Sequence, residues 1–254
     1  MTIDVSIIQK YLSGEPSGTY SGLWIYDGGR LFEEPSPKLR ANVAQLLIKV
    51  KESLANYSPA NETPILDVFP NFYAAVKKTM VFLVVGLKDP YDMMMDEYDG
   101  QFCVILDLIR LLGYGADFTL SVHEFIHVCL HERYPQPENA NYREQLDYIA
   151  FDEGFAHVFA YMERYPGESF NATLEQRYEA AKAALEIALE ETDEEKQRDC
   201  LYRSQTGYYW DKFAAIAGKL YLLKNAERMK TIYDVGWKGF ADGILCDEAP
   251  FRYG

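Results

Sequence analysis

Residues 117–135 read DFTLSVHEFIHVCLHERYP, and this stretch holds His123 and His127, two of the four histidines of the chain. Positions four residues apart lie on the same face of a helix, so both imidazoles are able to reach one metal ion. Glu124 directly follows the first histidine, which is where zinc hydrolases of this motif carry their general base. The spacing therefore predicts a metal-binding helix with a carboxylate beside its two ligands.

The residues around the motif favour a buried helix, because apolar side chains occur on nearly all of its sides. Asp117, Thr119 or Ser121 is suited to cap its start. Pro135 is suited to end it. Buried polar groups need partners, so inward-facing histidines require either a metal or ordinary hydrogen bonds, and the motif favours the metal. His131 lies two turns beyond the first histidine, too far to share its ion, and is expected at the helix end.

A catalytic zinc usually takes three protein ligands and a water, so the motif needs one further ligand. Residues 141–166 predict a second long helix. On this helix four residues recur at four-residue spacing and form one stripe: Ile149, Glu153, His157 and Tyr161. A stripe that mixes apolar residues with a Glu and a His faces the core or a cleft. Glu153 is the leading third ligand, and His157 is the alternative.

The motif, followed about 25 residues later by Asp152–Ala156 (DEGFA), resembles the gluzincin zinc metallopeptidases of the peptidase MA clan. In that group a Glu-Gly-hydrophobic-Ala stretch on the next helix supplies the third zinc ligand. The resemblance implies His123, His127 and Glu153 as ligands of Zn²⁺ and Glu124 as general base. It also implies a thermolysin-like catalytic core, in which a small sheet lies beside the active-site helix and a helical region follows.

The resemblance covers about residues 101–161 and is distant. No Gly-x-Met-x-Asn stretch precedes the zinc motif, which places the chain outside the aminopeptidase branch that carries it. His157 stands where thermolysin-like members use an Asp to support a zinc-binding histidine. This departure leaves a three-histidine site through His157 open.

The oxyanion formed during peptide hydrolysis needs a hydrogen-bond donor besides the metal. The candidates are His157, Tyr161, Tyr208 and Tyr209, and the last two begin a helix expected at residues 208–224. A Tyr or His from a later helix plays this part in gluzincins, as the resemblance implies.

Composition limits the classes of partner. The chain has 254 residues, of which 48% are apolar and 25% charged, and its net charge is −14. Nucleic-acid binding requires basic patches, so we do not expect this acidic chain to bind nucleic acid. Residues 1–30 lack a basic start with an apolar run, and residues 79–87 are too short to span a bilayer. We expect a cytoplasmic protein with reduced cysteines and no membrane contact.

The pattern of elements predicts an α+β fold, mostly helical, with a small N-terminal mixed sheet beside the zinc-binding helix. Buried strands are expected at residues 79–87 and 101–109 and a helix at 36–59, while residues 17–29 suggest strands and turns. The acidic stretch at residues 174–199 suggests one long amphipathic helix.

We expect an N-terminal α/β portion over residues 1–100 and a catalytic helical portion over 101–254, together one compact unit. The expected function is zinc-dependent hydrolysis of peptide bonds in a peptide or protein substrate, with endo- or exopeptidase action and oligomeric state left open. The alternative is a weak or inactive metallopeptidase-fold protein that binds peptides or proteins as a regulatory module.

Overall fold

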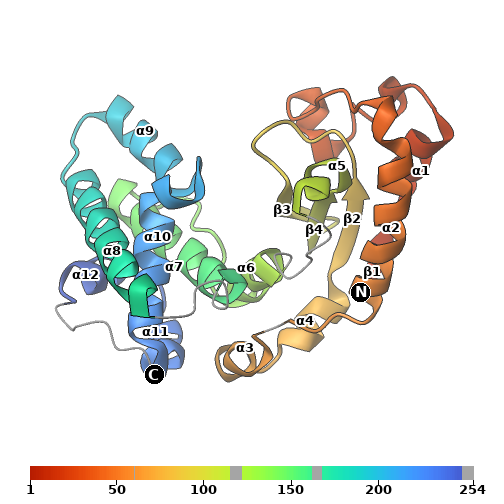
Figure 1. Cartoon of the computed structure of the whole chain (residues 1–254). Helices are drawn as coiled ribbons and strands as arrows, with labels where there is room; N and C mark the ends of the chain where they lie inside the picture. The colour runs from red at the N-terminus through yellow and green to blue at the C-terminus, as the bar shows by residue number, and fades with distance from the viewer. Residues whose placement is uncertain (60, 115–121, 162–167, 248–254) are drawn as a thin grey trace. The chain divides into compact units, whose positions relative to one another are not determined.

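The structure is a computed structural model that describes residues 1–59, 61–114, 122–161 and 168–247 (Figure 1). It is mostly helical and contains one mixed four-stranded sheet, which confirms the α+β class. The three residues expected to cap the helix of His123 and His127 lie outside the described residues: Asp117, Thr119 and Ser121.

Contacts divide the chain into two compact units. The first consists of Met1–Ala60 and Asn71–Val128, and the second of Asn61–Pro70 and Cys129–Gly254. The boundary thus falls inside a helix and not at residues 100 and 101. The expected division differs because residues 93–98 and 101–107 are paired strands of one sheet, which a boundary at residue 100 would separate.

The sheet of the first unit has the strand order β1-β2-β4-β3. Its strands are β1 (Thr2–Asp4), β2 (Met80–Val84), β3 (Met93–Tyr98) and β4 (Gln101–Asp107). Strands β1, β2 and β4 are parallel, and β3 runs antiparallel to β4. The two central strands are buried along most of their length, as expected for parallel strands covered on both faces. They confirm the strands expected at residues 79–87 and 101–109.

In the chain, most helices of the first unit lie between β1 and β2, and α5 follows β4. They are α1 (Ser6–Ser13), α2 (Arg40–Ala55), α4 (Phe72–Lys78) and α5 (Leu108–Leu111), with short 3₁₀ turns η3 (Pro37–Leu39) and η4 (Leu112–Tyr114). The helix expected at residues 36–59 is confirmed by α2. The strands suggested at residues 17–29 are wrong, because this segment forms the 3₁₀ turns η1 (Ser17–Thr19) and η2 (Trp24–Gly29). Asp27 and the two glycines after it have positive φ angles, which a strand does not accommodate.

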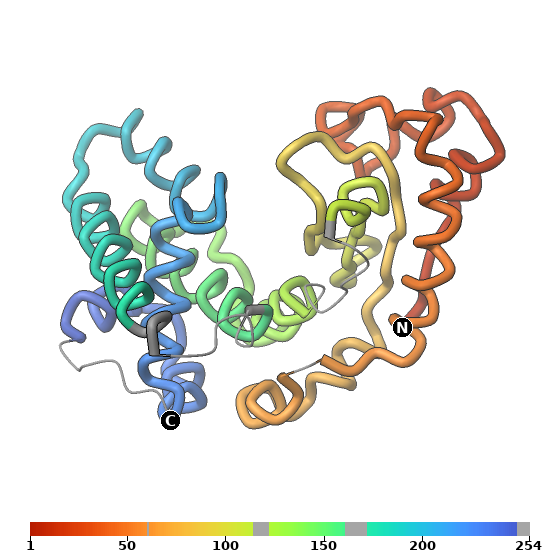
Figure 2. The backbone as a smooth tube through the Cα atoms, in the orientation of Figure 1, coloured from red at the N-terminus to blue at the C-terminus, as the bar shows by residue number. Residues whose placement is uncertain are grey.

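The second unit is helical in the part that is described. Its elements are α3 (Glu62–Val68), α7 (Tyr142–Tyr161), α8 (Glu168–Leu189), α9 (Glu194–Gln205), η7 (Tyr209–Asp211), α10 (Phe213–Lys224), η8 (Ala226–Arg228), α11 (Met229–Val235) and α12 (Phe240–Leu245). Helices α7 and α10 lie against each other, as the backbone trace also shows (Figure 2). Helix α6 (Val122–Arg133) crosses from the first unit into the second.

Two glycines explain how closely α7 and α10 approach. A Cβ atom on Gly218 would lie 1.9 Å from the carbonyl oxygen of Ala150, and one on Gly154 would lie 2.8 Å from the backbone carbon of Gly218. Neither position has room for a side chain, so the two backbones are in direct contact. This contact fixes the register of α10 against the part of α7 that carries Glu153.

Two expected helices have different bounds. The single helix expected over residues 174–199 is wrong, because Asp193 starts α9 by accepting hydrogen bonds from the backbone N–H groups of Glu195 and Lys196, each at 3.0 Å. The helix expected at residues 208–224 begins later, at Phe213, after the 3₁₀ turn η7. In the described part of the chain, no helix combines the length and the apolar character needed to cross a membrane.

Candidate metal centre

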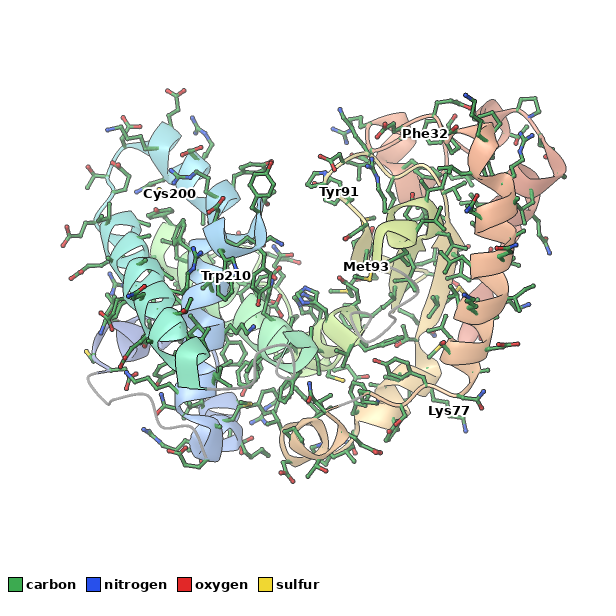
Figure 3. The ribbon with its side chains drawn as sticks, in the orientation of Figure 1. Phe32, Lys77, Tyr91, Met93, Cys200 and Trp210 are labelled. Carbon is green, nitrogen blue, oxygen red and sulfur yellow. The ribbon has the colours of Figure 1, made fainter. Side chains whose placement is uncertain are left out.

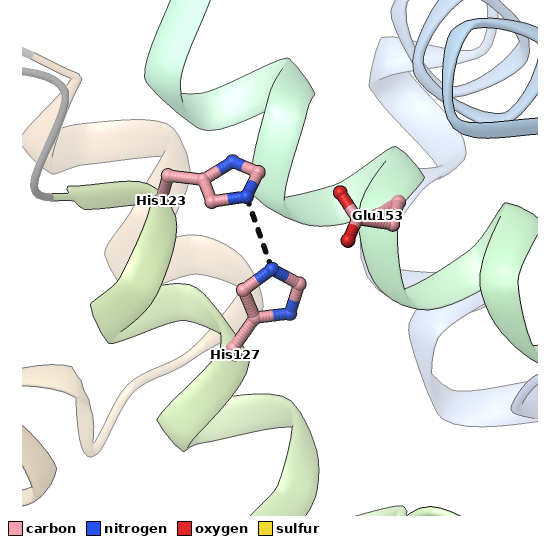
Figure 4. A group of neighbouring side chains, drawn as sticks. All are labelled: His123, His127 and Glu153. Atoms are coloured by element: carbon pink, nitrogen blue, oxygen red, sulfur yellow. Dashed lines mark hydrogen bonds between the residues drawn. The ribbon is translucent and has the colours of Figure 1, made fainter. Parts of the chain in front are cut away.

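Helix α6 presents His123 and His127 on one face, as the four-residue spacing predicts. Their Nε2 atoms lie 3.1 Å apart, and a dashed line joins them in Figure 4. Two nitrogens bound to one tetrahedral zinc at 2.0–2.1 Å are separated by about 3.3 Å. The two histidines therefore already stand at nearly the separation that a shared zinc requires.

Glu153 on α7 supplies the third donor. Its carboxylate faces the two imidazoles in Figure 4, and one ligand atom from each of the three residues lies within 4.8 Å of the other two. The second half of α6 belongs to the same unit as α7. There the Tyr148 hydroxyl lies 2.9 Å from Nε2 of His131, which ties α7 to the end of α6.

His157 supports Glu153 within α7. Its Nδ1 lies 2.9 Å from the backbone carbonyl oxygen of Glu153 and 3.2 Å from the carboxylate oxygen Oε2. A carbonyl oxygen only accepts, so Nδ1 carries the proton and donates. Burial lowers the pKa of His157, against the opposing effect of the Glu153 carboxylate. The imidazole is therefore neutral at pH 7, with a lone pair on Nε2.

The two candidates for the third ligand lie differently with respect to the motif histidines. Among the described residues, the donor group that contains both motif histidines is completed by Glu153, and His157 belongs to neither group of metal-type donors. Its Nδ1–H is directed to Glu153. In this arrangement Nδ1 of His157 contacts both the backbone carbonyl and the carboxylate of Glu153.

Glu124 lies beside the two histidines. The residue is 6% exposed. Its Oε1 atom is 4.0 Å from Nε2 of His123. The carboxylate of Glu124 therefore lies beside the His123 nitrogen that faces His127.

The tyrosine candidates separate clearly. Tyr208 is 86% exposed, so its side chain lies in solvent and not in a buried site. The ring of Tyr209 lies 5.5 Å from the ring of His157, measured between centroids. The side chain of Tyr161 lies outside the described residues. Of the tyrosines that the structure describes here, Tyr209 is therefore the one that accompanies His157.

Two features were not anticipated from the sequence. His131, expected as a polar residue at the helix end, has Nε2 3.3 Å from Oδ1 of Asp152 and joins a second group of metal-type donors with His127. Lys219 is 1% exposed, and its Nζ donates to the hydroxyl oxygen of Tyr209 at 2.5 Å. The signal for Lys219 was a single charged residue inside the apolar stretch at residues 213–223.

No protein-family model, curated protein or solved structure matches the chain. Function must therefore be argued from the side chains that the fold brings together. These are the two motif histidines with Glu153, the adjacent Glu124, and the pair formed by His157 and Tyr209.

Proposed function

We propose that the protein is a zinc-dependent peptidase, a distant gluzincin of the peptidase MA clan with a thermolysin-like core. The observation that carries this proposal is the meeting of His123, His127 and Glu153, with one donor atom from each within 4.8 Å of the others. The mixed four-stranded sheet followed by a helical unit agrees with such a core. The cytoplasmic location expected from the sequence stays a prediction.

The donor set suits a catalytic zinc rather than a structural one. Structural zinc sites are closed by four protein ligands, often cysteines, whereas catalytic sites use three ligands such as two His and one Glu. The separation of 3.1 Å between the two histidine nitrogens fits a shared ion. The contact of 3.2 Å between Nδ1 of His157 and Oε2 of Glu153 offers the carboxylate the outer support that such sites need.

When bound, zinc acts as a Lewis acid and lowers the pKa of a coordinated water to about 7. Glu124 is placed to accept a proton from the attacking water on its carboxylate and to deliver it to the leaving amine nitrogen. Tyr209, whose ring lies 5.5 Å from that of His157, is the proposed donor to the carbonyl oxygen of the scissile bond as negative charge develops there.

The same geometry argues against His157 as the oxyanion donor. Its Nδ1–H is already directed to Glu153, and a neutral imidazole has no second N–H to offer. Tyr208 is too exposed to be held at a site. We therefore assign the hydrogen bond to the oxyanion to Tyr209. We assign the orientation of the Glu153 carboxylate to His157. The substrate is a peptide or protein, cleaved internally or at an end.

Metal content and cleavage test the two parts of the proposal separately. Protein purified without added metal is expected to contain near-stoichiometric zinc, and a mixed peptide library is expected to be cleaved. Glu124→Gln should retain the zinc and lose cleavage. Glu132→Gln, an exposed residue two turns along the same helix, is the matched control and should cleave as the wild type does.

Each result has a distinct meaning. Absence of zinc, together with no rebinding on addition, removes the metal site and the peptidase with it. Equal cleavage by wild type and Glu124→Gln shows that Glu124 is not the base. Zinc with peptide binding but no cleavage of any library member favours the regulatory binding module.

A further inference from the structure

Two groups of metal-type donors occur along α6. The first group is the one already described: His123, His127 and Glu153. The second group consists of His127, His131 and Asp152, and one ligand atom from each lies within 4.8 Å of the other two. Its two histidines are four residues apart on α6, so they share one face of that helix. Asp152 stands on α7, in the same unit as His131, and Figure 3 draws the side chains of both helices as sticks.

One separation within the second group fits a shared ion better than a direct ion pair. Nε2 of His131 lies 3.3 Å from Oδ1 of Asp152. A charge-assisted N–H···O bond is usually about 2.7–2.9 Å long. A nitrogen and an oxygen bound to one tetrahedral zinc at about 2.0–2.2 Å are separated by about 3.4 Å. The two atoms therefore stand at the distance expected for two ligands of one ion.

The second group lies away from solvent. His127 is 7% exposed and Asp152 8%, and the side chain of His131 is 11% exposed. A buried carboxylate needs a partner of opposite charge or a metal ion, because removing its charge from water is costly. The ligand atoms are at most 4.8 Å apart. Closing them to about 3.4 Å around an ion requires shifts of at most about 1.4 Å, which rotation of the side chains supplies.

The hydroxyl of Tyr148 contacts the same nitrogen of His131. It lies 2.9 Å from Nε2 of His131 and 3.2 Å from the backbone carbonyl oxygen of Tyr134. A ring nitrogen has either one lone pair or one proton to offer, so an ion on Nε2 displaces the contact with Tyr148. The tyrosine O–H is then still able to donate to the Tyr134 carbonyl. Binding in the second group therefore costs the contact between His131 and Tyr148, which lowers its affinity.

His127 belongs to both groups. A neutral imidazole carries one N–H and one lone pair on nitrogen, so it ligates one ion at a time. An ion held by His131 and Asp152 therefore takes His127 away from the first group. The two groups are alternative sites for one ion and not the two halves of a two-metal centre.

We propose that His127, His131 and Asp152 form a second site for a divalent transition-metal ion such as Zn²⁺, and that this site and the first group are occupied one at a time. Two imidazole nitrogens and one carboxylate oxygen suit zinc and similar ions. Binding at the second site is independent of the peptidase function. Its consequence for cleavage rests on that function, because an ion held there leaves the proposed catalytic group without His127.

The test removes the ligands that are unique to the first group and measures whether the chain still binds metal. The paired variant His123→Gln/Glu153→Gln keeps the whole second group. It should bind about one Zn²⁺, measured against a competing chelator, and one Co²⁺, measured by the visible absorption of the four-coordinate ion.

A third change then identifies the site. Adding His131→Gln to the paired variant should weaken zinc binding by more than about 100-fold, because a change in an outer partner of a ligand already costs about 10- to 100-fold. Adding Glu132→Gln instead is the matched control, since Glu132 is an exposed neighbour on the same helix, and the affinity should stay the same.

A folded paired variant that binds neither ion overturns the inference, and so does a zinc affinity that His131→Gln leaves unchanged. Thermal unfolding establishes that each variant is folded. If the paired variant does not fold, His123→Gln alone is measured with and without His131→Gln. If His131→Gln does not fold, Asp152→Asn takes its place. In each case a loss of affinity supports the second site and an unchanged affinity overturns it.

Single variants of the wild-type chain separate this inference from the proposed function. Zinc that is lost in His131→Gln but kept in Glu153→Gln lies in the second group, which supports the inference and overturns the first group as the catalytic centre. Zinc that is lost in Glu153→Gln, with no binding by the paired variant, supports the first group and overturns the inference. Two ions per wild-type chain, both lost in His127→Gln, overturn the exclusive use of His127.

Discussion

The contact between α7 and α10 makes Gly218→Ala a severe test of the fold around the proposed site. The new Cβ atom would lie 1.9 Å from the carbonyl oxygen of Ala150. An ordinary C···O contact is about 3.3 Å. The helices must therefore separate by about 1.4 Å, the difference of these two values, or the chain must bend locally. Overpacking of this kind costs about 3 kcal/mol or more.

Thermal unfolding measures this cost. For a chain of this size, 1 kcal/mol corresponds to about 2–4 °C in Tm, so Gly218→Ala should lower Tm by about 6–12 °C. Gly22→Ala is the control, because a Cβ atom there would meet nothing within 4 Å. A Gly218→Ala protein that unfolds within about 2 °C of wild type would refute the close backbone contact and the register drawn from it.

Three further outcomes are expected. His157→Phe keeps a ring beside Tyr209 but removes the N–H donated to Glu153. Zinc affinity, measured against a competing chelator, should therefore fall by about 10- to 100-fold. An unchanged affinity would contradict the supporting role of His157. Burial raises the pKa of Asp107 to about 6, above its ordinary 3.8, so the native state binds this proton more tightly and the free energy of unfolding should fall as pH rises from about 4 through 6. Urea denaturation checks this, and Asp107→Asn should flatten the slope in that window. Tyr26→Phe removes the donor to the Val85 carbonyl at 2.6 Å and should lower the free energy of unfolding by about 1–2 kcal/mol, while a change under about 0.3 kcal/mol would show that the bond contributes nothing.

The elements that carry a strong local pattern were predictable from the sequence. The apolar runs at residues 79–87 and 101–109 contain the strands β2 and β4. Short continuous apolar runs of this kind are typical of strands that are buried on both faces. The four-residue spacing in α6 brought its two histidines together because a helix dictates that geometry locally. These features depend on residues close together in the chain.

Features that depend on distant residues were not predictable in the same way. The contact boundary inside α6 was not predictable from the local pattern, because pairing of β3 with β4 joins residues on both sides of position 100. The strand assignment at residues 17–29 failed because Asp27 and its two following glycines adopt positive φ angles that periodicity does not reveal. The hydrogen bond from Lys219 to Tyr209 was not predictable either, because Tyr209 lies ten residues away and outside the helix of Lys219.

The glycine after Glu153 has a physical reason that the sequence motif alone does not supply. Gly154 faces the backbone of α10 at Gly218, where a Cβ atom would lie 2.8 Å from the neighbouring carbonyl carbon. The proposed ligand therefore stands on the turn of α7 that is clamped directly to another helix. A carboxylate on such a turn loses little conformational freedom when it binds an ion, because its backbone is already fixed. The same contact fixes the backbone of Lys219, so one packing contact orders both the proposed third ligand and the start of the Lys219 side chain.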